Sequence, residues 1–134
     1  MRAIAVLGLG QTPSTEALRG MGIGSKPYEG RARLVIGAGD GLDTFEAGDV
    51  LVAPMTSPSY NVLLAMAGAV VTEEGDALSH AAIMARELAL PAVIGAPGAT
   101  AEIHDGDHVR VDPASGTVRV LKRAGESTNT TEEQ

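Results

Sequence analysis

The sequence predicts an α/β fold of short strands with two or more helices. Seventeen glycines among 134 residues indicate frequent turns between short elements. Short apolar runs bounded by glycine, proline and aspartate are typical of strands. Between these runs, two segments combine a helix-capping residue with amphipathic spacing, which predicts helices. Together these patterns indicate strands and helices that alternate along one compact chain.

Seven segments are predicted to be strands, because each is a mostly apolar run that ends at a turn signal. In chain order they are Ala3–Leu7, Arg31–Ile36, Val50–Ala53, Ala69–Thr72, Pro91–Gly95, His108–Val111 and Thr117–Leu121. The turn Pro113–Gly116 joins the last two strands into a hairpin. Gly48–Val52 and Gly106–Val111 are alike in sequence, and we interpret them as two similar hairpin edges.

Three helices are predicted. A short one occupies Ser14–Arg19, in a region broken by glycines. The second follows Ser57, which can cap it, and has Pro58 where a missing N–H is tolerated. It stops at Gly68, and its inward face is expected to consist of Val62, Leu63 and Met66. The third runs from about Ser79 to Leu88.

Length and composition limit the function. A chain of 134 residues can bury the core of one domain. The absence of cysteine excludes disulfides and thiol chemistry and suits a reducing cytosol. A net charge of −7 argues against nucleic acid or anionic membrane as partner. The apolar start is too short for a membrane span and lacks the features of a signal peptide. We therefore expect a soluble, cytoplasmic protein.

The chain divides into three segments. Residues 1–21 form a poorly defined N-terminal segment, and residues 22–121 contain the clear strand and helix patterns. Residues 122–134 are expected to be a disordered tail, because one alanine is their only apolar residue.

His80, one of three histidines, stands at the start of the third helix, after a loop that contains Gly75. Backbone N–H groups at a helix start carry partial positive charge and favour anions. Imidazole is a nucleophile toward phosphoryl groups, and the ordinary pKa of about 6.5 leaves most free imidazole neutral in the cytosol. The helix surface beside His80 is expected to be low and open because of three alanines, Ala81, Ala82 and Ala85. This pattern favours a phosphoryl carrier.

Each of these residues also has a simpler interpretation. A lone histidine at a helix start is more often a cap or a surface residue than a catalyst. Ser79 and Asp76 are candidate helix caps that would fix the loop before His80. Arg86, six residues after His80, is either a nearby cation or a surface ion-pair partner. Spacing alone therefore favours function only modestly.

A longer pattern surrounds the histidine. The segment from Thr72 to Gly95 reads TEEGDALSHAAIMARELALPAVIG. It closely resembles the phosphohistidine signature of PEP-utilising enzymes, which include phosphoenolpyruvate synthase, pyruvate phosphate dikinase, rifampicin phosphotransferase and the first enzyme of the PEP-dependent sugar phosphotransferase system. The flanking segments also resemble this family, and the likeness covers residues 22–121. These flanks are Gly22–Ser25 with Gly30, Val52–Pro58, Asp105–Asp112 and Gly116–Val118.

The resemblance implies a swivelling β/β/α phosphohistidine domain, which shuttles a phosphoryl group between a nucleotide or PEP site and an acceptor site on partner domains. Carried over by position, His80 is the phosphoryl acceptor and Gly75 the loop glycine. Ser79 matches the small hydroxyl residue before the histidine, and Arg86 matches the motif arginine. Two positions depart from the pattern. Asp76 replaces a second glycine, and Leu78 stands where the dikinases have a regulatory threonine.

The departures have different consequences. A positive φ at Asp76 would be strained, and its carboxylate would oppose an incoming phosphate unless it caps the helix. Because Leu78 has no hydroxyl group, control by phosphorylation at that position is not expected.

The resemblance also implies partners. The chain has no ATP-binding fold and no barrel with Mg²⁺-binding carboxylates, so it is not expected to turn over alone. The domain itself is expected to bind no cofactor or metal. Mg²⁺ and ATP or PEP are implied on an ATP-grasp-like nucleotide-binding partner, on a PEP- or pyruvate-binding partner, or on both.

Three other functions compete with the carrier. Asp76 supports a swivel or binding module that has lost phosphotransfer. The two similar hairpin edges suggest a domain with a swinging prosthetic group, but neither Lys26 nor Lys122 sits at a hairpin tip. A metal site from His104 and His108 has helical spacing, but the Asp-Gly-Asp between them is typical of a turn. We expect both of these histidines to be surface loop residues.

Overall fold

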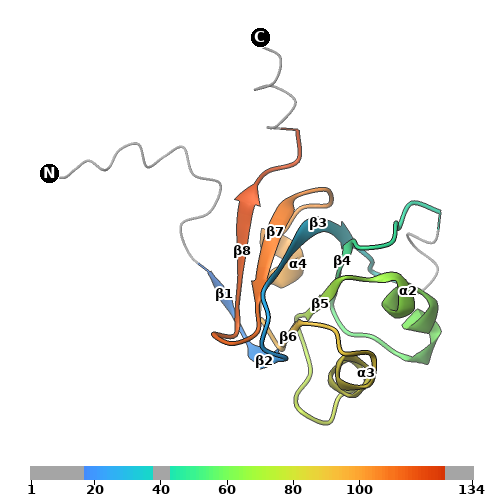
Figure 1. The fold of residues 1–134 in the computed structure, drawn as a ribbon. Coiled ribbons are helices and arrows are strands. Elements are labelled where there is room, and N and C mark those ends of the chain that lie inside the picture. Colours follow the sequence, from blue (N-terminus) through green and yellow to red (C-terminus); the bar gives the residue numbers. More distant parts are fainter. Residues whose placement is uncertain (1–16, 38–42, 126–134) are drawn as a thin grey trace, which may run out of the picture.

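The computed structural model describes residues 17–37 and 43–125, and Figure 1 shows their arrangement. One mixed sheet of eight strands, in the order β1-β8-β7-β3-β4-β5-β6-β2, dominates the fold. Its strands are β1 (Leu18–Arg19), β2 (Met21–Ile23), β3 (Tyr28–Leu34), β4 (Val50–Ala53), β5 (Ala69–Thr72), β6 (Ala92–Ile94), β7 (His108–Asp112) and β8 (Thr117–Lys122). The helices are a 3-10 turn (Pro58–Tyr60), α2 (Asn61–Met66), α3 (His80–Leu88) and α4 (Ala99–Glu102).

The sheet is nearly closed into a barrel. Strand β1 pairs with β8 at one end of the strand order, and β2 pairs with β6 at the other. Only Gly20 separates β1 from β2, so the chain itself connects the two ends. A Cβ at Gly20 would lie 2.6 Å from the carbonyl oxygen of Ile94, closer than real Cβ atoms approach. Glycine is therefore required where the chain passes between the two strands.

The parallel strands β4, β5 and β6 are buried on both faces, which explains their continuous apolar sequences. Successive side chains of a strand point to opposite faces. Val50 and Val52 of β4 accordingly pack in one hydrophobic cluster, and Leu51 and Ala53 pack in another.

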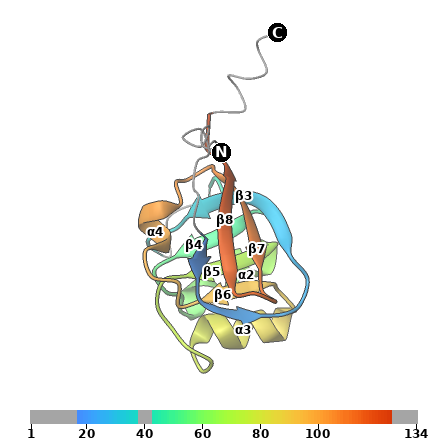
Figure 2. The ribbon, with the colours of Figure 1, turned by 90° about the vertical axis from the view of Figure 1, so that its left-hand side faces the viewer.

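Helices and the hairpin cover these two faces in layers. Helices α2 and α3 cover one face with Leu63, Leu64 and the alanines of α3. Helix α4 and the hairpin β7–β8 cover the other face with Ile103, Val109 and Val118 among others. Figures 1 and 2 show α3 and α4 on different sides of the parallel strands. The arrangement is an α/β fold, and it leaves the N-terminus of α3 at the molecular surface.

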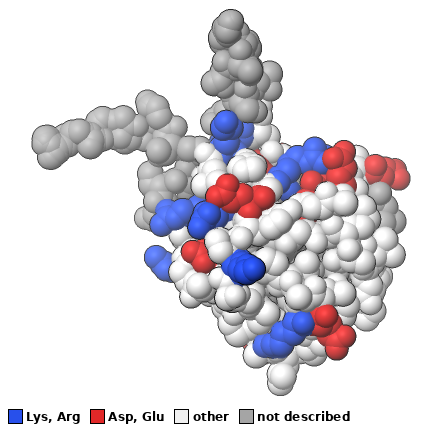
Figure 3. Space-filling view, viewed as in Figure 1, with Lys and Arg blue, Asp and Glu red and all other residues white. Residues whose placement is uncertain are grey.

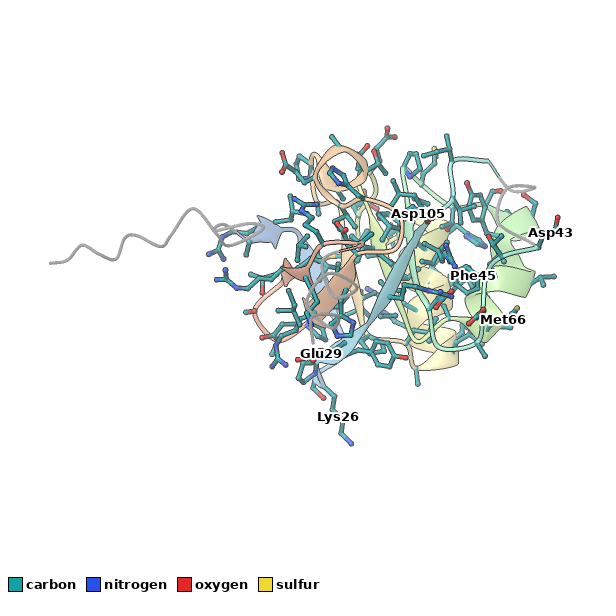
Figure 4. All side chains as sticks on the ribbon, turned by 90° about the horizontal axis from the view of Figure 1, so that it is seen from above. Lys26, Glu29, Asp43, Phe45, Met66 and Asp105 are labelled. Carbon is teal, nitrogen blue, oxygen red and sulfur yellow. The ribbon has the colours of Figure 1, made fainter. Side chains whose placement is uncertain are left out.

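Ion pairs bind β3 to its neighbours. Glu29 and Asp105 lie near the two ends of β3 (Figure 4). Glu29 pairs with Arg110 at 2.8 Å, and Asp105 pairs with Arg33 at 3.0 Å. Asp49, 6% exposed, accepts hydrogen bonds from Arg31, and this contact raises the pKa of Arg31 above its ordinary value. Acidic and basic side chains alternate in this region, beside a broad uncharged face (Figure 3).

The predicted elements are largely confirmed. Strands β4 and β5 have the predicted bounds, β7 and β8 form the predicted hairpin, and α3 begins one residue after the expected cap Ser79. Ser57 and Pro58 do begin a helical segment, but as a 3-10 turn whose cap makes no side-chain hydrogen bond. The predicted strand Ala3–Leu7 lies outside the described residues.

Several predictions are wrong. Leu18–Arg19 is a strand, not the end of a helix, because pairing with β8 overrides local preference. Val62 is 63% exposed, and Leu64 takes the inward position. Gly48–Val52 is no hairpin edge, since β4 runs parallel to both of its neighbours. The prediction of an open surface holds only in part for the three alanines: all of them pack into the core, and Ala81 also lines a hollow beside His80.

The structured part of the chain extends beyond residues 22–121. Strand β1 begins at Leu18, and β8 ends at Lys122. After β8, Arg123 and the backbone N–H of Ala124 donate to the fully buried Asp107 at 2.7 and 2.8 Å. Among the described residues no helix is long and apolar enough to cross a bilayer.

Candidate functional site

His80 lies where two loops leave the same edge of the sheet. Strands β4 and β5 are parallel, and their last residues, Ala53 and Thr72, are register partners. The segments that follow neighbouring parallel strands meet at one edge of the sheet. The loop after β5 leads to His80, and the segment after β4 passes through Thr56 to α2. Parallel pairing thus brings together residues that are distant in sequence.

The loop before His80 is held by its own hydrogen bonds. Gly75 has φ of +122°, a conformation that favours glycine. The carbonyl oxygen of Asp76 accepts from the N–H of Ser79 at 3.0 Å and from its hydroxyl at 2.8 Å. The Ser79 hydroxyl oxygen in turn accepts from the N–H of Ala82 at 3.2 Å, which makes Ser79 the predicted helix cap. His80 is therefore the first residue of α3.

Asp76 fits this loop without strain. Among the described residues other than glycine, only Ala89 has a positive φ. The position of Asp76 therefore does not require a second glycine. Its carboxylate Oδ1 accepts from the N–H of Leu78 at 2.9 Å, which stabilises the turn.

Both ring nitrogens of His80 contact polar side chains. The Nδ1 atom lies 2.7 Å from Oγ1 of Thr56, which is 6% exposed. The Nε2 atom lies 3.1 Å from Oδ1 of Asn61, an exposed residue at the start of α2. The inner nitrogen therefore faces a buried hydroxyl, and the outer one faces an exposed amide at the surface.

A hollow of about 370 Å³ opens beside the imidazole. It is lined by Met55, Thr56, Glu74, Gly75, Ser79, His80 and Ala81, and none of these is Lys or Arg. The hollow is large enough for a phosphoryl group. Its positive electrostatic contribution comes from the N-terminal end of α3.

Arg86 contacts the loop rather than the imidazole. Its Nη1 donates to the carbonyl oxygen of Ala77 at 2.8 Å. The rest of Arg86 lines a second hollow of about 400 Å³ together with Lys26 and the apolar Leu90. Arg86 therefore stabilises the loop that presents His80, and it does not line the hollow beside the ring.

The other two histidines lie elsewhere. His104 is exposed, and its N–H donates to Asp107. His108 begins strand β7, not a loop, and its Nε2 lies 3.9 Å from Glu29. Within residues 17–37 and 43–125, no group of three or more potential metal-binding His, Cys, Asp or Glu side chains occurs.

Sequence reasoning missed the two side chains that touch the imidazole. Thr56 lies in the segment Val52–Pro58, and the family resemblance of that segment is the signal in the sequence that points to it. Asn61 carries no local signal, because only the packing of α2 beside α3 brings it to His80.

Sequence comparisons match most of the chain to known proteins. The family described as PEP-utilising enzyme, mobile domain, matches residues 45–116. Phosphoenolpyruvate synthase of Deinococcus radiodurans is 43% identical over 99 residues, which are 74% of this chain and 13% of that protein. Rifampicin phosphotransferase of Streptomyces sviceus is 39% identical over 105 residues, which are 78% of this chain and 12% of that protein.

Solved structures show similar folds. A solution structure of Enzyme I has a TM-score of 0.51 and 37% identity, covering 57% of this chain and 32% of that chain. Aconitase X of Thermococcus kodakaraensis has a TM-score of 0.60 and 21% identity, covering 81% of this chain and all of that chain. The second likeness concerns the fold alone. The chain spans about an eighth of the length of the curated relatives that it matches.

Proposed function

This chain belongs to the family of PEP-utilising enzyme mobile domains, and from that membership we propose that it carries a phosphoryl group on His80. One observation supports the proposal above all. The imidazole stands at the first residue of α3, beside an open hollow, with its inner nitrogen against Thr56 and its outer nitrogen toward the surface. This is the arrangement that a nucleophile for a phosphoryl donor needs.

The outer nitrogen, Nε2, is the atom that accepts the phosphoryl group in this proposal. Thr56 is buried and covers Nδ1, whereas Asn61 is exposed and can move away from Nε2. The lone pair of Nε2 forms the N–P bond as the donor's P–O bond breaks, and the leaving oxygen keeps the electron pair. The start of α3 stabilises the resulting phosphohistidine dianion through its partial positive charge.

The supporting residues act on the loop. Gly75 allows the backbone turn, Ser79 caps α3, and Arg86 ties the loop through the carbonyl oxygen of Ala77. We assign them positioning roles, because none of them hydrogen-bonds to the imidazole among the contacts that the structure describes. Precise placement of the reacting atoms contributes strongly to phosphoryl transfer.

The proposed partners supply what the hollow lacks. No Lys or Arg lines it, so the charge of a transferred phosphoryl group must be balanced mainly by the partner. We propose that an ATP-grasp-like nucleotide-binding domain, a PEP- or pyruvate-binding domain, or both provide these charges together with Mg²⁺ and ATP or PEP. In this proposal the domain swivels between the partner sites.

An apolar collar around His80 supports docking to such partners. We define it as four exposed side chains: Met55 (57% exposed), Val62 (63%), Leu78 (82%) and Ile83 (46%). Met55 lines the hollow, Val62 follows Asn61, Leu78 lies in the loop before the histidine, and Ile83 is one helical turn after it. Exposed apolar groups gathered around a reactive residue indicate a contact surface that excludes water.

Transfer from a protein donor tests the proposal. The chain is incubated with ATP and Mg²⁺, or with PEP and Mg²⁺, and with Deinococcus radiodurans phosphoenolpyruvate synthase from which the mobile domain has been removed. Intact-mass and peptide mass spectrometry should find one acid-labile phosphoryl group on His80. The His80→Ala variant should lack it, and the His108→Ala variant should retain it. As a positive control, the truncated enzyme must phosphorylate its own mobile domain when that domain is added separately. If this control succeeds and His80 is labelled with neither donor, the carrier role is refuted and a non-catalytic swivel module is favoured.

A further inference from the structure

Asn61 is the side chain that faces the outer nitrogen of His80. Its Oδ1 lies 3.1 Å from Nε2, and on the other side of the ring the Thr56 hydroxyl lies 2.7 Å from Nδ1. A hydroxyl can either donate or accept a hydrogen bond. In an amide, by contrast, the oxygen only accepts and the NH₂ group only donates. The orientation of the Asn61 amide therefore dictates where the ring hydrogen resides.

The two orientations have opposite consequences. With Oδ1 toward the ring, the hydrogen of neutral imidazole stays on Nε2, and Nδ1 accepts from Thr56. Nε2 then has no free lone pair and cannot attack phosphorus. A half-turn about the Cβ–Cγ bond of Asn61 presents NH₂ instead, and the hydrogen moves to Nδ1, which donates to Thr56. Oxygen and nitrogen of an amide have nearly the same shape, so both arrangements fit the same heavy-atom positions.

We propose that Asn61 is a positioning residue that selects the tautomer of His80 and thereby decides whether Nε2 is nucleophilic. This inference rests on the proposed function, in which Nε2 receives the phosphoryl group. With its oxygen toward the ring, the amide holds His80 in an unreactive state. With its NH₂ group toward the ring, the amide leaves the Nε2 lone pair available. Asn61 is exposed, so docking of a partner at the apolar collar can reach it and turn it.

Chemical phosphorylation tests this idea without a partner protein. Phosphoramidate transfers its phosphoryl group to histidine: the Nε2–P bond forms as the P–N bond breaks, and the nitrogen leaves with the electron pair as ammonia. The proton on Nδ1 of the product ring then passes to ammonia, which becomes ammonium. The exposed His104 and His108 serve as references within the same molecule.

Three variants separate the effects. Asn61→Asp places a carboxylate, which only accepts, beside Nε2. It should hold the hydrogen on Nε2 and slow labelling of His80 about tenfold, the size expected for one charge-assisted hydrogen bond. Asn61→Leu removes the hydrogen bond and should label at least as fast as the native chain. Ser59→Asp adds the same charge two residues from Asn61, at an exposed side chain that contacts Ser57, and it should leave the rate unchanged.

The ring ¹⁵N chemical shifts of His80, which distinguish a protonated nitrogen from one with a lone pair, give a readout independent of any reaction. The Asn61→Asp variant should show the hydrogen on Nε2 in a larger fraction of molecules than the native chain. The proposal is overturned if the Asn61→Asp variant has the same tautomer population and the same labelling rate as the native chain. It is also overturned if Asn61→Leu or Ser59→Asp slows labelling of His80 as much as Asn61→Asp does. Failure of the carrier role would give a different result: protein donors would transfer no phosphoryl group to His80, while Asn61→Asp would still shift the tautomer.

Discussion

Replacing Thr56 by valine tests whether the buried hydroxyl orients the imidazole. The Thr56 Oγ1 atom lies 2.7 Å from Nδ1 of His80, and the residue is 6% exposed, so water has little access to replace it. Valine keeps the branched shape and removes the hydroxyl. A neutral hydrogen bond contributes about 1 kcal/mol, which corresponds to about a fivefold change in rate. The same loss should lower Tm by about 4 °C for a domain of this size.

The assay is phosphoramidate labelling with separation of the two phosphohistidine isomers by NMR. Labelling on Nε2 should slow about fivefold, and the labelled nitrogen should not change, because the valine methyl still covers Nδ1. Thr117→Val is a matched control, since Thr117 is a buried threonine in β8 whose hydroxyl contacts Ser115. It should alter Tm but neither the rate nor the isomer. A native rate in Thr56→Val would refute the orienting role.

Three further predictions concern the loop, the collar and the C-terminal boundary. Gly75→Ala should lower the free energy of unfolding by about 1–2 kcal/mol, measured by urea titration, because φ is +122° there; an unchanged midpoint would contradict the strain. Leu78→Ser should slow transfer from a protein donor but not from phosphoramidate. The control Leu121→Ser, which alters an exposed leucine in β8, should slow neither reaction. Equal rates of transfer from the protein donor to the two variants would contradict a docking role for Leu78. Removing residues 123–134 should destabilise the domain by about 3–5 kcal/mol, since Asp107 then loses Arg123 and remains buried with unpaired charge; a native Tm would show that the fold ends at β8.

The parts of the fold that were predictable have local causes. Strands β4 and β5 can be recognised in the sequence as continuous apolar runs, because parallel strands buried on both faces need no polar positions. The hairpin β7–β8 follows from its turn residues, and α3 follows from Ser79 and the apolar spacing after it. Helix α4 was missed because four residues are too few to display a period. The strand Leu18–Arg19 was misassigned because only its distant partner β8 holds it extended.

The sequence by itself determined that His80 begins a helix after a glycine-containing loop, in a motif that resembles the phosphohistidine signature. These features are local, since a cap, a turn and a helix period depend on residues a few positions apart. Tertiary structure alone decided what touches the ring. Parallel pairing of β4 with β5 delivers Thr56 and Asn61 to the imidazole from about twenty residues away. Tertiary structure also decides that Arg86 contacts the carbonyl oxygen of Ala77, because the orientation of a long side chain depends on the neighbours that packing provides.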